Sequence, residues 1–558
     1  MKKQLVYTIT SILVLASFIS CEELLNSKED IYLTDEMLDT RYSQIFNYAN
    51  RMYSNVQNGF NTIDDNLFAT VSDEAQYFIT TSESQRFNEG SWNQYYNPDN
   101  FYVKGYQGIY DVNYFLEHSV NYKEQLATNR DTLSTDNKRK YADDVEDIER
   151  FRAEARILRC YYYFELIKRY GGVPLIIKTY SNPADANLPR ETFENIVEFI
   201  VNEIDETLPY LVENWTDVGM PNKDGRITQG TAMCIKAISL LYAASPLNNP
   251  ENDTSKWERA AKAYHDIIET GRYALHNDFQ SLFLESITAD KSKEIIWAVR
   301  MSANNQMERR NYPIGTSGGN TGVCPSHNLF LAYEHKTNNP TNPYAGMDPR
   351  FAMSVAYNGS VWTGRQLDMS LGGIDDQSKK NTSPTGYYLK KFLNDNVNLV
   401  NDDKKNRNWI IFRYADVLLS YAEAMNEAYG PNDKQNFTYT ALQAINLVRQ
   451  RQGVAMKAIT STLVPDITTF REKVKNERRV ELAFEGHRYW DLCRWKDAEI
   501  ILNQPILGVK VEKINSRFTY TQFESSKRKF IAPKMYLYPI PQSEIVKSGG
   551  ILVQNPGW

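Results

Sequence analysis

One short run of residues has the spacing of a serine nucleophile. Gly315, Ser317 and Gly319 match the pattern G-x-S-x-G, in which the serine stands on a tight turn that joins a strand to a helix. Pro313 stands where that strand should end, and residues 320–322 (NTG) do not favour the start of a helix. We therefore interpret the run as a ligand-facing loop. A lipid-anchored hydrolase that uses Ser317 is kept as an alternative function.

A second run, residues 476–492, gathers acidic and basic side chains around His487. It reads NERRVELAFEGHRYWDL, with glutamates at positions 477, 481 and 485. Four-residue steps place these glutamates on one face of a helix, where they can pair with arginines. Apolar residues interrupt the charges throughout the run, as they do in a protein core. The pattern favours a structural ion network over an acid–base site.

The sequence has no spacing typical of a metal or redox centre. The six histidines form neither H-x-x-x-H nor H-E-x-x-H, no twelve-residue calcium loop is present, and no two cysteines stand at C-x-x-C spacing. We therefore predict no metal, no cofactor and no catalytic residue. Four cysteines, Cys160, Cys234, Cys324 and Cys493, could form two disulfides or remain thiols. Apolar helical patterns around three of them favour buried free thiols.

The amino-acid composition argues against a disordered chain and against a nucleic-acid-binding protein. The chain has 558 residues, of which 42% are hydrophobic and 24% charged, as in ordinary folded proteins. Its net charge of −6 offers no basic surface for nucleic acid. The 37 Tyr and 9 Trp together outnumber the 24 Phe. Such rings with a polar edge suit positions that meet water or a hydroxylated ligand.

The elements that must position these residues are mostly helices in adjacent pairs. Apolar residues recur at three- and four-residue steps in three pairs of segments, and a fourth, opening pair is expected. The pairs are 145–170 with 191–211, 228–244 with 256–270, 411–429 with 439–452, and 35–58 with 105–120. Four hairpins of this kind would make a curved, mainly α scaffold.

Two regions lack helical periodicity and are rich in aromatic residues, namely 60–104 and 300–400. Long irregular stretches in a compact protein are usually functional or linkers, and aromatic content argues against a disordered linker. Short strand-like runs border them, such as residues 294–299. A binding site is expected in these two regions.

The N-terminal sequence has the form of a targeting signal. Lys2 and Lys3 precede sixteen uncharged residues, which are too few to span a bilayer but suit a signal peptide. The segment ends in Phe-Ile-Ser before Cys21, which resembles a bacterial lipoprotein box with Phe18 where Leu is usual. We predict a signal peptide over 1–20, lipidation of Cys21 and attachment to a membrane by lipid.

Several motifs then identify a family. They are FRAEAR at 151–156, YGGVPL at 170–175, KAISLLYAASP at 236–246, DPRF at 348–351, RYADVLL at 413–419, the run 476–492, YPIP at 538–541 and NPGW at 555–558. In this order they resemble the SusD/RagB family of Bacteroidetes outer-membrane lipoproteins. Trp558 stands where Tyr is more common.

The resemblance implies a fold and a function. The fold would be four tetratricopeptide-like helical hairpins packed against an irregular part with a few short strands. After the signal peptide, residues 21–558 would form one body, with an N-terminal part at about 22–235 and a C-terminal part at about 290–558. The protein would stand at the cell surface, capture an oligo- or polysaccharide without catalysis, and pass it to a SusC-like TonB-dependent outer-membrane transporter. A purely structural lid on that transporter is the other alternative.

The resemblance and ring chemistry together select candidate glycan contacts. The face of a sugar ring presents C–H groups that an aromatic ring can cover, and its edge presents hydroxyls that Asp, Asn or Arg can bind. Trp92 is the first candidate because it lies in a polar stretch and falls where the starch-binding prototype places one of its rings. The others are Tyr95, Asp65, Asp73 and Arg86 in the first region, and Cys324, Trp362, Arg365 and Tyr387 in the second.

Overall fold

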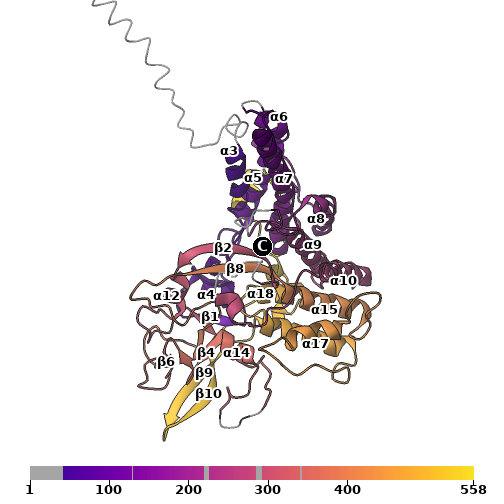
Figure 1. Cartoon of the computed structure of the whole chain (residues 1–558). Helices are drawn as coiled ribbons and strands as arrows, with labels where there is room; N and C mark the ends of the chain where they lie inside the picture. The colour runs from indigo at the N-terminus through magenta and orange to yellow at the C-terminus, as the bar shows by residue number, and fades with distance from the viewer. Residues whose placement is uncertain (1–41, 128–129, 219–224, 285–291, 338, 340–341) are drawn as a thin grey trace, which may run out of the picture. The chain divides into compact units, whose positions relative to one another are not determined.

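The computed structural model describes residues 42–127, 130–218, 225–284, 292–337, 339 and 342–558, so the predicted signal peptide and Cys21 lie outside the described residues. The described chain is mainly helical with short strands (Figure 1), as predicted. The helices are α3 (Tyr42–Arg51), α4 (Glu83–Asn88), α5 (Tyr102–His118), α6 (Tyr122–Ala127), α7 (Thr135–Tyr170), α8 (Phe193–Thr207), α9 (Gln229–Ala244), α10 (Thr254–Glu269), α11 (Ser281–Leu284), α12 (Gln306–Asn311), α13 (His327–Phe330), α14 (Pro349–Ser354), α15 (Tyr414–Tyr429), α16 (Ala441–Arg449), α17 (Ile467–Glu481), α18 (Arg488–Arg494), α19 (Ala498–Ile501) and α20 (Gln542–Lys547).

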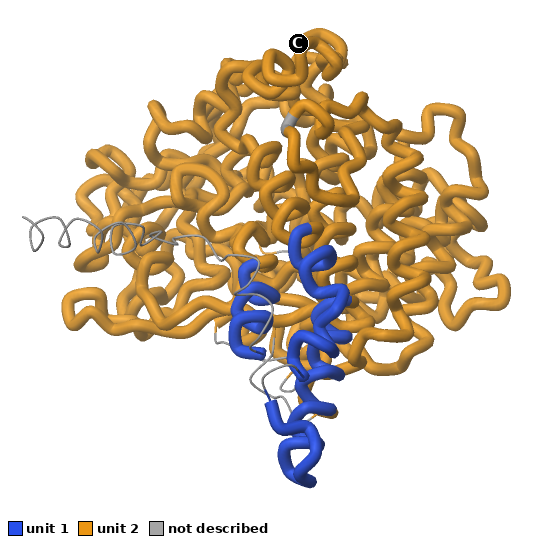
Figure 2. The backbone as a smooth tube through the Cα atoms, turned by 90° about the horizontal axis from the view of Figure 1, so that it is seen from above, with its two compact units in different colours: residues 1–51, 114–152 blue, residues 52–113, 153–558 orange. Residues whose placement is uncertain are grey.

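The chain divides into two compact units (Figure 2). One contains residues 1–51 and 114–152, and the other contains residues 52–113 and 153–558. In the first unit, the ring of Tyr48 on α3 lies 5.4 Å from Tyr114 and 6.1 Å from Phe115 on α5. The opening helix pair is therefore confirmed over its described residues. The single body expected for residues 21–558 stays a prediction.

The other predicted helix pairs lie in the second unit, except that residues 145–152 of α7 belong to the first. Helix α7 contacts α8 through the Tyr163 and Phe199 rings, 5.8 Å apart, and α9 packs on α10 and α15 on α16. Helix α8 also packs on α9, and α10 on α15, so successive hairpins stack as tetratricopeptide-like repeats do. Side-chain caps begin α8, α10 and α16, because Thr192, Asp253 and Thr440 each accept a hydrogen bond from a first-turn backbone N–H.

The strands of the described residues form five two-stranded antiparallel sheets. They are β1 (Ala75–Tyr77) with β3 (Val323–Pro325), β2 (Ile295–Asn304) with β8 (Lys405–Arg413), β4 (Val355–Tyr357) with β7 (Tyr387–Leu389), β5 (Val361–Trp362) with β6 (Arg365–Gln366), and β9 (Ile506–Ile514) with β10 (Arg517–Ser526). The strand expected at residues 294–299 is the start of β2. The β9–β10 hairpin was not predicted. Its turn residues Asn515 and Ser516 both have positive φ, as a tight hairpin turn requires.

The run 476–492 forms a buried ion network, as its charge pattern predicted. Arg413, at the end of β8, contacts Glu481 and Glu485 at 2.7 Å and Glu294 at 2.8 Å. Arg350 of α14 contacts Glu477 at 2.6 Å and Glu481 at 2.8 Å. Arg449, Arg451 and Lys391 complete it. The network joins β8, α14 and α17, and its role is to hold these elements together.

Candidate functional site

The two irregular regions in which a site was expected lie side by side. Strand β1 belongs to the first region and β3 to the second, and they pair with Ala75 opposite Pro325 and Tyr77 opposite Val323. Beyond β1, the Phe78 N–H donates to the Gly322 carbonyl at 3.1 Å. Chain segments that are far apart in the sequence thus build one part of the second unit.

Trp92 is a core residue in this structure. Its side chain is only 3% exposed, and its ring stacks on Phe87 at 5.0 Å. The rings of Tyr538 and Trp558 lie 5.1 and 4.7 Å from it on other sides. A ring enclosed in this way has no face for a sugar. This corrects the expectation that Trp92 is an exposed plate, and the physical reason is that residues near the C-terminus cover it.

Asp73 is also buried. Its carboxylate accepts hydrogen bonds from Arg488 at 2.8 and 3.0 Å and lies 2.6 Å from Nη2 of Arg479. Burial alone would raise the pKa of Asp73, but these two guanidinium groups outweigh it and hold the pKa well below its usual range. The residue therefore anchors α17 and α18 to the start of β1, and its oxygens are not available to sugar hydroxyls.

Glu74, the next residue, is also buried, but its pKa is shifted in the opposite direction. Its Oε1 accepts a hydrogen bond from the Phe484 N–H at 3.3 Å, and its Oε2 accepts one from the Ser72 hydroxyl at 3.5 Å. Burial and the neighbouring Asp73 charge raise the pKa of Glu74 to about 8, although Arg488 and Arg479 oppose this. Glu74 is therefore largely protonated in the folded protein at neutral pH.

This raised pKa predicts a pH dependence of stability. Between about pH 4.5 and pH 8 the unfolded chain loses the Glu74 proton while the folded chain keeps it, so the free energy of unfolding falls as pH rises. The side chain of Glu74→Gln cannot titrate, so the free energy of unfolding of this variant lacks that fall with pH. Between pH 5 and pH 8, the free energy of unfolding of the wild type should therefore drop relative to that of the variant by on the order of several kcal/mol. Urea unfolding at the two pH values measures the difference.

The control for this measurement is Glu89→Gln. Glu89 is an exposed glutamate at the end of α4. This variant should follow the wild type at both pH values. Equal stability changes for Glu74→Gln and the wild type between pH 5 and pH 8 would show that Glu74 is already ionised in the folded state.

Three candidates of the second region are core residues as well. The Cys324 thiol is fully buried in β3, and burial raises its pKa to about 12. The Trp362 ring packs edge-on against Tyr312, with the centroids 5.9 Å apart. The Tyr387 hydroxyl lies 2.8 Å from Nδ1 of His327. Each was expected to face a ligand, and in each case apolar packing across the loop region encloses the side chain instead. All four described cysteines are buried free thiols, as favoured above.

The charged candidates near the surface are engaged in ion pairs. Arg365 holds Asp375 with two contacts of 2.6 Å. Arg86 pairs with Glu83 at 3.0 Å across one turn of α4, and Asp65 pairs with Arg310 at 3.3 Å. Asp65 and Arg86 keep much of their side chains in solvent. None of these three residues lines the cavity to which Tyr95 belongs.

Tyr95 is the candidate that stands at a hollow. Its side chain is 77% exposed, and it helps to line a shallow cavity of about 450 Å³. The other lining residues are Asn93, Gln94, Tyr96, Asn97, Asn100, Pro539, Pro541, Gln542, Ser543 and Val546. All of these described side chains are uncharged, and most carry an amide or a hydroxyl. We call this cavity the Tyr95 hollow.

The local sequence explains how Tyr95 is presented. Residues Asn93 and Tyr96 exchange two backbone hydrogen bonds, of 2.8 and 3.1 Å, and so close a tight turn with Gln94 and Tyr95 at its tip. The Asn93 side chain accepts from the Tyr95 N–H at 2.9 Å, which is the asparagine turn that such a chain reversal favours. The Gln542 N–H donates to the Gln94 carbonyl at 2.9 Å and ties the turn to α20.

Other residues of the Tyr95 hollow were missed. Tyr96 is half exposed, and its hydroxyl donates to Glu83 at 2.5 Å. The sequence offered a signal for it, since the run NQYYN combines adjacent rings and amides. Nothing in the sequence indicated that Gln542 and Ser543, which follow the YPIP motif, line the same hollow.

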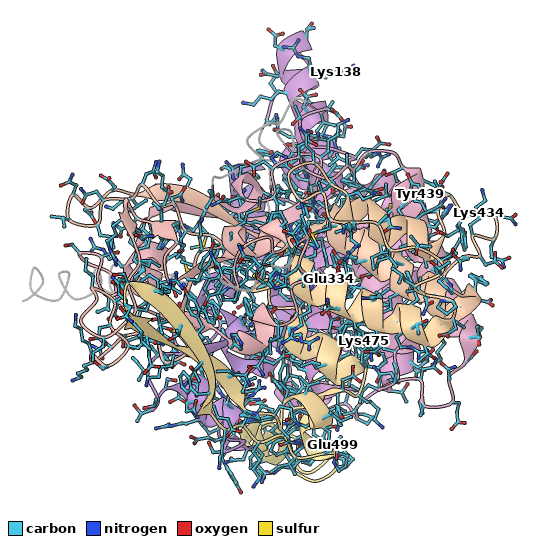
Figure 3. The ribbon with its side chains drawn as sticks, turned by 90° about the horizontal axis from the view of Figure 1, so that it is seen from below. Lys138, Glu334, Lys434, Tyr439, Lys475 and Glu499 are labelled. Carbon is cyan, nitrogen blue, oxygen red and sulfur yellow. The ribbon has the colours of Figure 1, made fainter. Side chains whose placement is uncertain are left out.

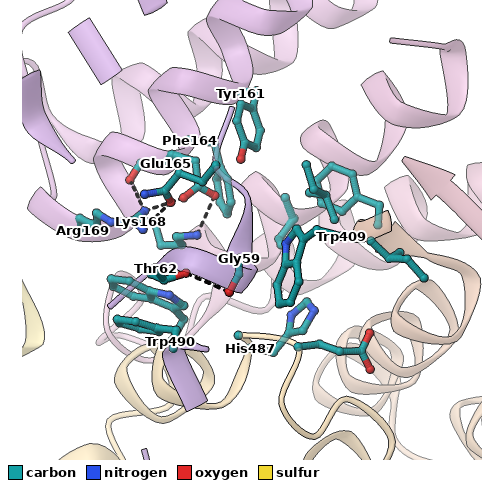
Figure 4. A pocket seen from close by; sticks show the side chains of 18 of the residues that line it. Gly59, Thr62, Tyr161, Phe164, Glu165, Lys168, Arg169, Trp409, His487 and Trp490 are labelled. Carbon is teal, nitrogen blue, oxygen red and sulfur yellow. Dashed lines mark hydrogen bonds and ion pairs between the residues drawn. The ribbon is translucent and has the colours of Figure 1, made fainter. Parts of the chain in front are cut away.

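An interior cavity of the second unit is a different kind of space (Figure 4). It has a volume of about 110 Å³, well below the range of about 300–1,000 Å³ typical of small-molecule sites. Lys168 contacts Glu165 at 2.6 Å and lies over the Trp490 ring at 5.1 Å, and burial lowers the pKa of its ammonium to about 8. Burial also lowers the pKa of His487, which lines the same cavity. A polar cavity of this size suits a few water molecules.

Ser317 lacks the surroundings of a nucleophile. The preceding element is the short helix α12 and the next is strand β3, so the strand–serine–helix order of the motif is not present. Among the described residues, no histidine or carboxylate hydrogen-bonds to the Ser317 hydroxyl. The G-x-S-x-G spacing is therefore part of an exposed loop, and the hydrolase alternative has no support.

The described part of the chain contains neither a cluster of metal-ligating side chains nor a helix that could span a membrane. No three His, Cys, Asp or Glu side chains among these residues are grouped so that they could hold a metal ion. No helix among them is both long and apolar enough to cross a membrane.

The sequence matches two family models. One, described as the SusD family, covers residues 293–558, and the other, described as "Starch-binding associating with outer membrane", covers residues 23–225. Among relatives, the chain is 25% identical to SusD-like protein P38 of Formosa agariphila over 65% of this chain and 70% of P38. It is 23% identical to SusD-like protein P2 of the same organism over 75% of each chain.

Solved structures share the fold. A SusD-like protein from Bacteroides fragilis superimposes with a TM-score of 0.74 at 22% identity, over 95% of this chain and 99% of that one. A SusD-like carbohydrate-binding protein from the same species gives 0.71 at 24% identity, over 92% and 98%. Surface glycan-binding protein A from Bacteroides fluxus gives 0.63 at 19% identity, over 93% and 100%.

Proposed function

Because the chain belongs to the SusD/RagB family of carbohydrate-binding proteins, we propose that it captures an oligo- or polysaccharide at the cell surface through the Tyr95 hollow. It then hands the glycan to a SusC-like TonB-dependent outer-membrane transporter, and no bond is made or broken in the process. Lipid attached to Cys21 holds the protein at the outer membrane.

The observation that carries this proposal is an exposed ring beside uncharged hydrogen-bonding groups. The Tyr95 ring can cover the C–H face of a sugar, since 77% of the side chain is open to solvent. Amides of residues such as Asn93, Gln94 and Gln542 can bind hydroxyls at the sugar edge. A neutral lining of this kind suits a neutral glycan better than a phosphate or a nucleic acid, which would require basic side chains.

Two observations support the place of action. The family model over residues 23–225 carries the words "associating with outer membrane" in its description. The N-terminal sequence has the form of a lipoprotein signal that ends at Cys21. A lipid-anchored receptor with a shallow site would hold a long glycan near a transporter without enclosing it.

Affinity electrophoresis tests the proposal. The wild-type protein is run through gels that contain soluble starch, inulin, xylan, galactomannan or pectin, and retardation in at least one gel is expected. Tyr95→Ala should weaken binding to the retarding polysaccharide about tenfold, since a lost ring contact of about 1–2 kcal/mol corresponds to that ratio. Because Tyr95 is exposed, the melting temperature should not change.

The matched control is Tyr210→Ala, which removes a tyrosine of similar exposure, 67%, that does not line the hollow. It should bind as the wild type does. Wild-type retardation of Tyr95→Ala would exclude the Tyr95 hollow as the site. Absence of retardation in every gel would favour the purely structural lid.

A further inference from the structure

A second cavity lies beside the Tyr95 hollow and shares one helix with it. It has a volume of about 720 Å³, and α5 and α20 supply much of its lining. Gln542, Ser543 and Val546 of α20 line the Tyr95 hollow, whereas Glu544, Lys547 and the following residue Ser548 line the second cavity. At about 100° per residue these two sets lie on different faces of α20, so this short helix is the ridge between the two cavities.

One wall of the second cavity is a row of tyrosines. Tyr102, Tyr106 and Tyr110 follow at four-residue steps on α5, which places their side chains on one face of the helix. The rings of Tyr102 and Tyr106 lie 5.0 Å apart, and the Tyr106 hydroxyl donates to the Pro174 carbonyl at 2.7 Å. Tyr102 is only 4% exposed and its ring also packs on Tyr170 at 5.1 Å, whereas Tyr110, at the other end of the row, is 48% exposed. We call this cavity the tyrosine groove.

The remaining lining is apolar or neutral overall. Ile176, Leu188 and Leu552 add apolar surface, and Gln107 and Asn187 add amides. The lining residues Lys547 and Glu544 neutralise each other across 2.8 Å. The tyrosine groove therefore offers the exposed Tyr110 ring, hydrogen-bonding groups and no net charge, just as the Tyr95 hollow offers the Tyr95 ring and neutral hydrogen-bonding groups.

The volume of the groove indicates the size of the ligand. About 720 Å³ lies within the range of about 300–1,000 Å³ that holds drug-sized ligands, and it is more space than a single sugar ring fills. A chain of sugars could therefore use the groove, and such a chain would have to cross only α20 to reach Tyr95.

We propose that the tyrosine groove is a second binding surface for the glycan held in the Tyr95 hollow, so that this protein selects polymers over short oligosaccharides. The inference rests on the proposed function, because it assumes that the Tyr95 hollow binds glycan. Binding at one cavity raises the local concentration of the same chain at the other, which strengthens attachment of a polymer only. A trisaccharide in the Tyr95 hollow does not gain from the second cavity.

Two variants change the tyrosine groove without touching the Tyr95 hollow. Tyr110→Ala removes the exposed end of the row, and Ala184→Trp fills the groove from an exposed alanine in its wall. Binding is measured by titration calorimetry with amylopectin and with maltotriose. If the gel screen selects another polysaccharide, that polymer and its trisaccharide replace them. Both variants should weaken polymer binding five- to tenfold and leave trisaccharide binding unchanged.

The outcomes separate this inference from the proposed function. If Tyr95→Ala weakens both ligands while Tyr110→Ala and Ala184→Trp bind the polymer as the wild type does, the tyrosine groove is not a glycan surface and the proposed function stands. If Tyr95→Ala weakens neither ligand, the proposed function and this inference both fail. If the groove variants bind polymer normally but lose co-purification with the transporter, the groove takes a polypeptide and the inference is overturned.

Discussion

Arg413→Ala is expected to lower the free energy of unfolding by about 3–5 kcal/mol or more, a large part of the 5–15 kcal/mol that typically stabilises a folded protein. The guanidinium of Arg413 is buried and contacts three carboxylates, those of Glu294, Glu481 and Glu485. It also donates to the Glu481 backbone carbonyl at 2.9 Å. Without it, three carboxylates that are shut off from water would each lose a partner.

Chemical denaturation followed by fluorescence measures this effect. The matched control is Arg259→Ala, which removes an arginine that pairs with Glu198 at 2.6 Å where both side chains are about two-fifths exposed. This variant should cost less than about 1 kcal/mol, because water solvates both partners. A midpoint for Arg413→Ala equal to that of the wild type would mean that water or neighbouring lysine and arginine groups can replace the guanidinium.

Trp92→Ala is expected to destabilise the protein by about 3–5 kcal/mol, as other large-to-small changes in aromatic cores do. The ring touches Phe87, Tyr538 and Trp558, and its removal would leave a cavity among them. Trp92→Phe keeps part of the volume and should cost clearly less. Urea unfolding of the three proteins gives the order wild type, Trp92→Phe, Trp92→Ala.

The same variant separates a structural role from a binding role. Under conditions in which Trp92→Ala is still folded, its retention on polysaccharide should exceed that of Tyr95→Ala, because the buried ring has no face for a sugar. A Trp92→Ala protein with wild-type stability and no retention would instead identify Trp92 as the ring that binds.

The helical part of this protein could be predicted from local patterns. Apolar spacing and capping residues act within a few turns of the chain, so segments such as 228–244 and 256–270 were recognised nearly to their ends, at α9 and α10. The charge pattern of residues 476–492 was also sufficient to predict the ion network, because glutamates at four-residue steps among apolar residues are characteristic of a buried network of ion pairs. The β9–β10 hairpin shows alternation at Val509 and Val511, but its turn is Asn-Ser, which indicates a hairpin less strongly than Asn-Gly.

The candidate site could be predicted only in part. Residues 60–104 supply one side of the Tyr95 hollow, whereas residues 300–400 supply none of its lining and residues 539–546 supply the other side. Trp92 and Tyr95 stand three residues apart in the same polar stretch, yet one is enclosed and the other exposed. The difference comes from Tyr538 and Trp558, which reach Trp92 from the far end of the chain, and local sequence contains no sign of that contact. The same holds for Cys324, Trp362 and Tyr387, whose covering residues come from separate loops.

The packing of Trp558 also has a consequence for the order of events during synthesis. Its indole N–H donates to the Lys534 and Leu537 carbonyls at 2.9 Å, and its ring closes the aromatic cluster around Trp92. Trp92 is thus enclosed by residues that lie more than 400 positions further along the chain. During synthesis on the ribosome, the Trp92 ring therefore stays partly uncovered, because Trp558 cannot pack against it until residue 558 has been added.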